Sequence, residues 1–75
     1  MDLITLFQGI PEVSRAAIAD LKAGKSASEV ASTHIAPNLK AIEKNAGQEM
    51  NPTYVAYLLE YVVTNSTHGK NPVHS

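Results

Sequence analysis

The fold is decided by the stretch from Asn51 to Thr64, Asn-Pro-Thr-Tyr-Val-Ala-Tyr-Leu-Leu-Glu-Tyr-Val-Val-Thr, which is the only long apolar run in the sequence. It holds three of the four aromatic residues. Its first two residues are a helix start signal. The Asn51 side chain can accept hydrogen bonds from free backbone N–H groups, and Pro52 suits the first helical position. The stretch therefore predicts a helix that begins at Pro52.

Apolar residues surround most of this predicted helix. At about 100° per residue, the apolar arc is roughly 240° wide, whereas a surface helix needs roughly 100°. Two interpretations follow. The helix is a central element wrapped by the rest of the chain, or it packs one face on its own core and another on a second subunit or partner.

The tyrosines favour a half-wet location for one side of this helix, because a buried tyrosine hydroxyl needs a hydrogen-bond partner. Leu58 and Val62 lie between the tyrosine stripe and the core stripe of Val55, Leu59 and Val63. We therefore expect these two residues to belong to both core and interface. The predicted protein interface therefore consists of Tyr54, Tyr57, Leu58, Tyr61 and Val62.

Length and composition limit how this chain reaches stability. Its 75 residues make one domain at most. A chain of this size buries only about 60% of its unfolded surface, and small domains often add disulfides, metal or a partner. Cysteine is absent, so a compact bundle or oligomerisation remains. The lack of cysteine fits a reducing compartment, and we expect a cytoplasmic protein.

The charge balance argues against several partner classes. Six basic and seven acidic residues give a net charge of −1, whereas nucleic-acid binders usually carry a basic face. The N-terminal sequence Met-Asp-Leu-Ile-Thr-Leu-Phe-Gln lacks the positive region of a signal peptide. No run approaches the roughly 20 apolar residues that span a bilayer. We therefore expect no membrane partner.

Caps and breakers divide the rest of the chain into short helices. The first two start at Asp2 and Pro11 and end at Gly9 and Gly24. A serine–glutamate capping box opens a third helix over 27–35. Pro37 predicts a break or a kink and a fourth helix over 37–46. We expect an all-α bundle of four to five short helices over 1–64, the longest C-terminal, and a disordered polar tail over 65–75.

Helical spacing selects the residues that face the core in these four helices. Those residues are Leu3, Ile4, Leu6, Phe7, Ile10, Val13, Ala17, Ile18, Leu21, Val30, Ala31, Ile35, Leu39, Ile42 and Ala46.

The segment Ala19-Asp20-Leu21-Lys22-Ala23-Gly24-Lys25-Ser26 resembles a phosphate-binding loop, with glycine, lysine and serine in order. Its first position is alanine instead of glycine, and the preceding segment is predicted helical where the loop needs a strand. An anion or nucleotide site at Lys25 and Ser26, beside free N–H groups of the third helix, is one alternative function.

The segment from Leu21 to Ala31 resembles the opening of helix-turn-helix domains, in which a short loop precedes a helix with glutamate, aliphatic and alanine at these spacings. The resemblance implies a DNA-reading helix that carries Asn38, Lys40 and Lys44. The near-neutral net charge argues against tight DNA binding, because phosphate contacts dominate affinity.

Catalytic and metal motifs are missing from the sequence. His34, His68 and His74 are too scattered for a metal site, and no nucleophile motif frames a serine. We expect no enzyme, no metal and no cofactor. The composition favours a small adaptor- or inhibitor-like interaction protein, a size class that includes phage proteins, which self-associates through its C-terminal helix and binds another protein. A DNA-binding regulator and an anion binder are the alternatives.

Overall fold

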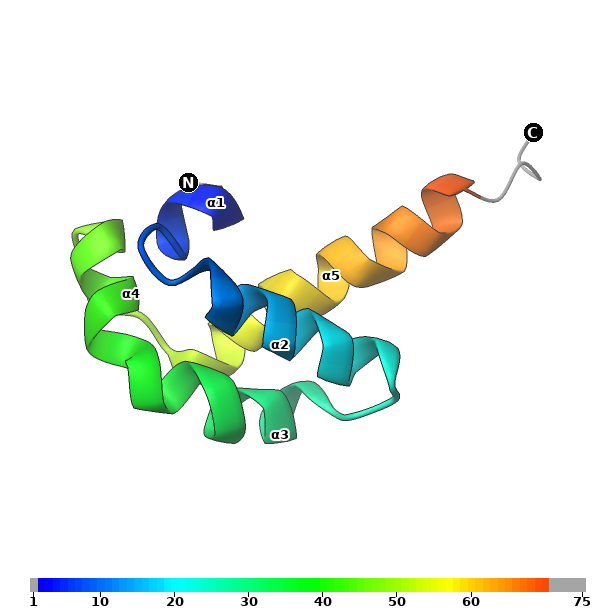
Figure 1. The fold of residues 1–75 in the computed structure, drawn as a ribbon, viewed down its shortest axis with the longest axis horizontal. Helices are drawn as coiled ribbons and strands as arrows, with labels where there is room; N and C mark the ends of the chain where they lie inside the picture. Colours follow the sequence, from blue (N-terminus) through cyan, green and yellow to red (C-terminus); the bar gives the residue numbers. More distant parts are fainter. Residues whose placement is uncertain (1, 71–75) are drawn as a thin grey trace.

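The other helices gather around the first half of the C-terminal helix, α5 (Pro52–Lys70) (Figure 1). The computed structural model describes the backbone of residues 2–70 and the side chains of residues 2–65. Within that range, α5 contacts α2 (Pro11–Lys22), α3 (Ala27–Val30) and the π-helical turn η1 (Ala31–Ile35). The second half of α5 projects away from the other helices in Figure 1.

Every regular element in the described residues is helical, which confirms the predicted all-α bundle. α1 (Leu3–Leu6) precedes α2 and contacts α4 (Leu39–Ala46). The short 3-10 turn η2 (Ala36–Asn38) joins η1 to α4. In the described part of the chain, no helix is long and apolar enough to cross a membrane.

Side-chain caps start three of the helices as the sequence predicts. In each case a side-chain oxygen accepts a hydrogen bond from a backbone N–H in the first turn, which satisfies a donor that the helix leaves free. The bonds run from Thr5 N to Asp2 Oδ1 (2.9 Å), from Glu29 N to Ser26 Oγ (3.1 Å) and from Thr53 N to Asn51 Oδ1 (2.8 Å). The bond to Thr5 also lowers the pKa of the Asp2 carboxyl.

At Pro37, where the sequence predicts a break or a kink, the helix does not break, because the backbone stays helical from 27 to 46. Ala36 keeps helical dihedral angles, φ −56° and ψ −44°. Proline has no N–H for the carbonyl four residues earlier, and its ring crowds that carbonyl. The chain adapts by changing helix type, through the π turn η1 and the 3-10 turn η2. The Asn38 side chain donates to the His34 carbonyl at 2.8 Å.

This adaptation also corrects the expectation that the longest helix is C-terminal. The longest uninterrupted helical run is the central one, 27–46. α5, at 19 residues, is the longest single α-helix. It continues to Lys70, past its expected end at Thr64. The expected disorder of residues 65–75 stays a prediction, since 71–75 lie outside the described residues.

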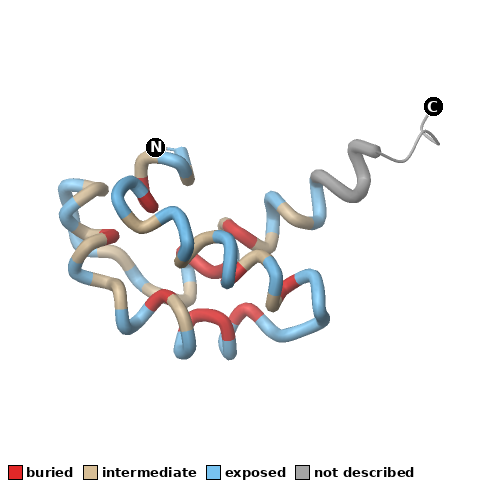
Figure 2. Tube along the Cα trace, in the orientation of Figure 1, coloured by how far each residue is buried: buried red, intermediate tan, exposed pale blue. Residues whose placement is uncertain are grey.

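The core contains most of the residues that helical spacing selects. Ile4 is an exception, because it points to solvent at 84% exposure, whereas Leu6 and Phe7 on the same helix are buried. Ala56 of α5, which the sequence does not select for the core, is fully buried. Figure 2 shows the buried positions in red. They are Leu6, Phe7, Ala17, Leu21, Ala27, Val30, Ala31, Ile35, Ile42, Val55, Ala56 and Leu59.

Two long-range polar contacts hold neighbouring helices together. Asn45 of α4 donates from Nδ2 to the carbonyls of Leu6 (2.9 Å) and Gln8 (3.0 Å), which fixes the end of α1. His34 Nε2 lies 2.7 Å from Asp20 Oδ2 and links η1 to α2. Both pairs are partly buried, so these polar groups replace lost water contacts with each other.

Gly47 supplies a test of the α4 end, where it has φ 73° and ψ 19° and its N–H bonds to the Glu43 carbonyl at 2.8 Å. Gly47→Ala places a Cβ in a left-handed conformation, so we expect a loss of about 1 kcal/mol and a melting temperature about 4–8 °C lower. Gly47→Asn is the control and should lose less, because asparagine tolerates this conformation. Equal melting of Gly47→Ala and wild type would contradict the cap.

Candidate interaction surface

One side of α5 carries large apolar side chains that the chain itself leaves uncovered. Tyr54 and Tyr57 are each 55% exposed, Tyr61 is 65% exposed and Val62 is 43% exposed. Leu58, between them, is half-buried. We call these five residues, the set predicted as an interface, the tyrosine face. The structure therefore places the tyrosines outside the core of a single chain.

Helical geometry explains this division. At about 100° per residue, Val55, Ala56 and Leu59 point to one side of α5, about 100–200° from Tyr54. These three side chains are fully buried against the bundle. The tyrosines fall on the opposite side, where no other element reaches them closely enough to bury them. Glu60, half-buried, borders the tyrosine face, and that face itself carries no charged residue.

An apolar groove adjoins the tyrosine face. It lies between α1, α2 and α5 and has a volume of about 540 Å³. Val62 belongs both to the groove and to the tyrosine face, and the exposed Ile4 lies on the α1 side. No charged residue lines the groove. Its lining residues are Leu3, Ile4, Thr5, Phe7, Gln8, Gly9, Pro11, Ser14, Ile18, Leu59 and Val62.

The predicted anion-site residues have partners within the chain. Lys25 Nζ lies 3.6 Å from Glu29 Oε2, and Ser26 Oγ accepts the Glu29 N–H at 3.1 Å. An anion at this place would compete with the Glu29 carboxylate for Lys25. The structure thus brings Lys25 and Ser26 together, around Glu29.

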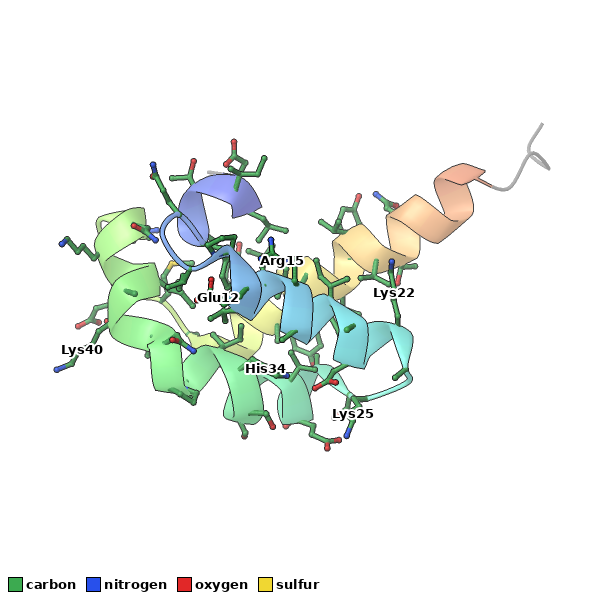
Figure 3. The ribbon with its side chains drawn as sticks, viewed as in Figure 1. Glu12, Arg15, Lys22, Lys25, His34 and Lys40 are labelled. Carbon is green, nitrogen blue, oxygen red and sulfur yellow. The ribbon has the colours of Figure 1, made fainter. Side chains whose placement is uncertain are left out.

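The predicted DNA-reading residues do not form a common surface with the preceding turn. Asn38 is half-buried and bonded to the His34 carbonyl, whereas Lys40 and Lys44 are exposed one turn apart on α4. The backbone between 27 and 46 is helical throughout, so the second turn of a helix-turn-helix is not formed there. Figure 3 shows Lys40 at the left side of the bundle and Lys25 at its lower right.

Metal-binding groups do not cluster in the described residues, where no three His, Cys, Asp or Glu side chains are arranged to hold a metal ion. His34 contacts Asp20 at 2.7 Å, a pair that sequence spacing does not reveal because 14 residues separate its members. The side chains of His68 and His74 lie outside the described residues. The tyrosine face and the groove are therefore the two surface features on which a function can be argued.

Comparison with known proteins adds no relative. No protein-family model, no curated protein and no solved structure matches the chain. Function is therefore argued from the surface itself.

Ser26 supplies a test that separates helix capping from anion binding. Ser26→Ala removes the acceptor for the Glu29 N–H, and we expect the free energy of unfolding to fall by about 1 kcal/mol. Lys25→Ala should change it by less than about 0.5 kcal/mol, because its ion pair is exposed. Chemical denaturation measures both. A rise of wild-type melting temperature in phosphate that Lys25→Ala abolishes would instead show an anion site.

DNA binding should be weak or absent near physiological salt, because the net charge is −1 and contacts to phosphates dominate affinity. A gel-shift assay with a pool of duplex DNA sequences measures it. Binding to particular sequences of the pool that is lost in both Lys40→Ala and Lys44→Ala would favour the DNA-binding alternative instead.

Proposed function

We propose that this is a non-enzymatic protein-interaction protein that self-associates through the tyrosine face of α5. The carrying observation is the exposure of Tyr54, Tyr57 and Tyr61 on one side of a helix whose other side is fully buried. Tyrosine is enriched in protein interfaces, where its ring is covered and its hydroxyl stays near water. A contiguous exposed apolar patch of this kind marks an interaction site in small proteins.

The energetics of a small chain support the same proposal. A domain of this size buries a small fraction of its surface and gains stability from a partner. Covered aromatic residues can each contribute about 2 kcal/mol or more to association, whereas rim residues contribute far less. Tyr54, Leu58 and Tyr61 fall within about 60° of one another around α5, so they would form the centre. Tyr57, next to Glu60, would lie toward the rim.

We further propose an adaptor- or inhibitor-like role, in which the assembled protein binds another protein. Small size and the absence of cysteine fit such a role in the cytoplasm. Support for a non-catalytic role comes from the partnered state of the candidate polar residues: His34 contacts Asp20, Lys25 contacts Glu29, and Asn38 binds a backbone carbonyl.

Tyr61→Asp tests the interface, because a carboxylate at the most exposed tyrosine position would be desolvated in the assembly. We expect the variant to be monomeric at about 100 µM, a concentration at which interfaces of about 6 kcal/mol still assemble. Its circular dichroism spectrum should stay helical, since Tyr61 is outside the core. Light scattering gives the native mass.

Leu59→Asp is the matched core variant, two positions away on the same helix. Leu59 is 1% exposed, so a buried unpaired charge there should unfold the chain. A Tyr61→Asp variant that keeps the native mass of an assembled wild type would show that the interface lies elsewhere.

A further inference from the structure

The tyrosine face alone is smaller than a stable interface. An aromatic side chain presents roughly 150–250 Å², so three tyrosines at the observed exposures offer roughly 350 Å². A standard interface buries about 800 Å² on each partner. Association through α5 therefore needs further apolar surface next to the tyrosines.

The groove between α1, α2 and α5 adds apolar surface next to the tyrosines. It shares Val62 with the tyrosine face, so the two are continuous. It also contains the most exposed large apolar residue of the described chain, Ile4. Because neither surface is lined by a charged residue, a second copy can cover both without burying an unpaired charge.

The spacing of the tyrosine face is compatible with antiparallel helices. The positions of Tyr54, Tyr57, Leu58 and Tyr61 keep the same spacing when the chain direction is reversed, so that Tyr54 is level with the partner's Tyr61. Antiparallel helices also bring opposite ends of their dipoles together. In this arrangement the first turns of the partner's α5 cover the middle of α5, where the helix begins to project from its own bundle. A parallel pair would leave both second halves side by side beyond the apolar stripe, which ends at Val62.

We propose that a second copy of this chain docks antiparallel along α5 and covers the opening of the groove. The partner's Tyr54 then lies against Val62 beside Ile4, and the same contact is repeated by two-fold symmetry. This inference rests on the proposed self-association, and it adds the orientation of the helices and the α1 anchor.

The orientation is tested with one spin label. The chain has no cysteine, so Asn65→Cys gives a single labelling site on the pairing side of α5 without removing an apolar residue. The variant carries the nitroxide and no ¹⁵N, and it is mixed with ¹⁵N-labelled wild type, which carries no nitroxide. Line broadening of the ¹⁵N-labelled amides therefore reports contacts between two copies only. We expect broadening at the amides of Asn51, Thr53 and Tyr54 and at those of α1.

Each outcome decides between arrangements. The start and the label position of α5 are about 21 Å apart along the helix axis. Broadening confined to amides around Val62 to Asn65 would show a parallel pair and overturn this inference, while leaving the proposed self-association intact. Broadening on α2 or α4 alone in a dimer would place the interface elsewhere. A monomeric wild type in the same sample would overturn both proposals.

Ile4→Ser tests the α1 anchor. Its side chain is almost fully exposed, so the change should leave helical content and monomer folding intact. We expect the dimer dissociation constant to rise about tenfold, because the aliphatic side chain no longer covers the groove mouth. Lys40→Ser, on exposed α4 away from the groove, is the control and should leave the constant unchanged. An unchanged constant in Ile4→Ser would remove the groove from the interface.

Discussion

The structure depends on how much of α5 the rest of the chain can cover. Apolar residues surround most of this helix, yet α2, α3 and η1 approach it from one side, over Val55, Ala56 and Leu59. The packing on that side holds α2, α3 and η1 together around α5. This packing also determines which side chains of α5 remain at the surface, because the side chains of one helix have fixed directions relative to one another.

Small residues allow the helices to pack closely, but they limit how much this packing contributes to the free energy of folding. Alanines occupy four of the buried core positions, Ala17, Ala27, Ala31 and Ala56. They let helices approach one another, but hydrophobic stabilisation scales with the apolar area removed from water. A core rich in alanine therefore stabilises a short chain modestly. The larger apolar side chains of α5, its tyrosines, lie outside that core, and their burial by a second copy would add what the alanines do not.

Local chemistry explains what the sequence reveals of this fold. The caps at Asp2, Ser26 and Asn51 are predictable because each side chain bonds a backbone N–H two or three residues away. At Pro37 the same local reasoning leaves a break and a kink both open. Ile35 and Ile42, on either side of the proline, are buried in the core, and the chain stays helical between them through a change of helix type.

Contacts between distant residues explain what the sequence conceals. The contact of Asn45 with the Leu6 carbonyl depends on α1 lying beside α4, which the sequence does not show. In the same way, the contact of Asp20 with His34 depends on the position of η1 next to α2. The groove is likewise invisible in the sequence, because three elements form it and Ile4 belongs by spacing to the core. Helical angle places the three tyrosines on a side of the helix away from Val55 and Leu59. Which side the bundle covers depends on the contacts of α5 with α2, α3 and η1, which the sequence does not give.

The central claim is that the unmodified chain associates through surface its own bundle leaves uncovered. Sedimentation equilibrium of the wild-type chain across a wide concentration range tests it most directly. The account predicts an average mass that rises with concentration from that of the 8.0 kDa chain toward the mass of two copies. A mass that stays at the single-chain value up to about 100 µM, where even interfaces of about 6 kcal/mol assemble, would contradict it.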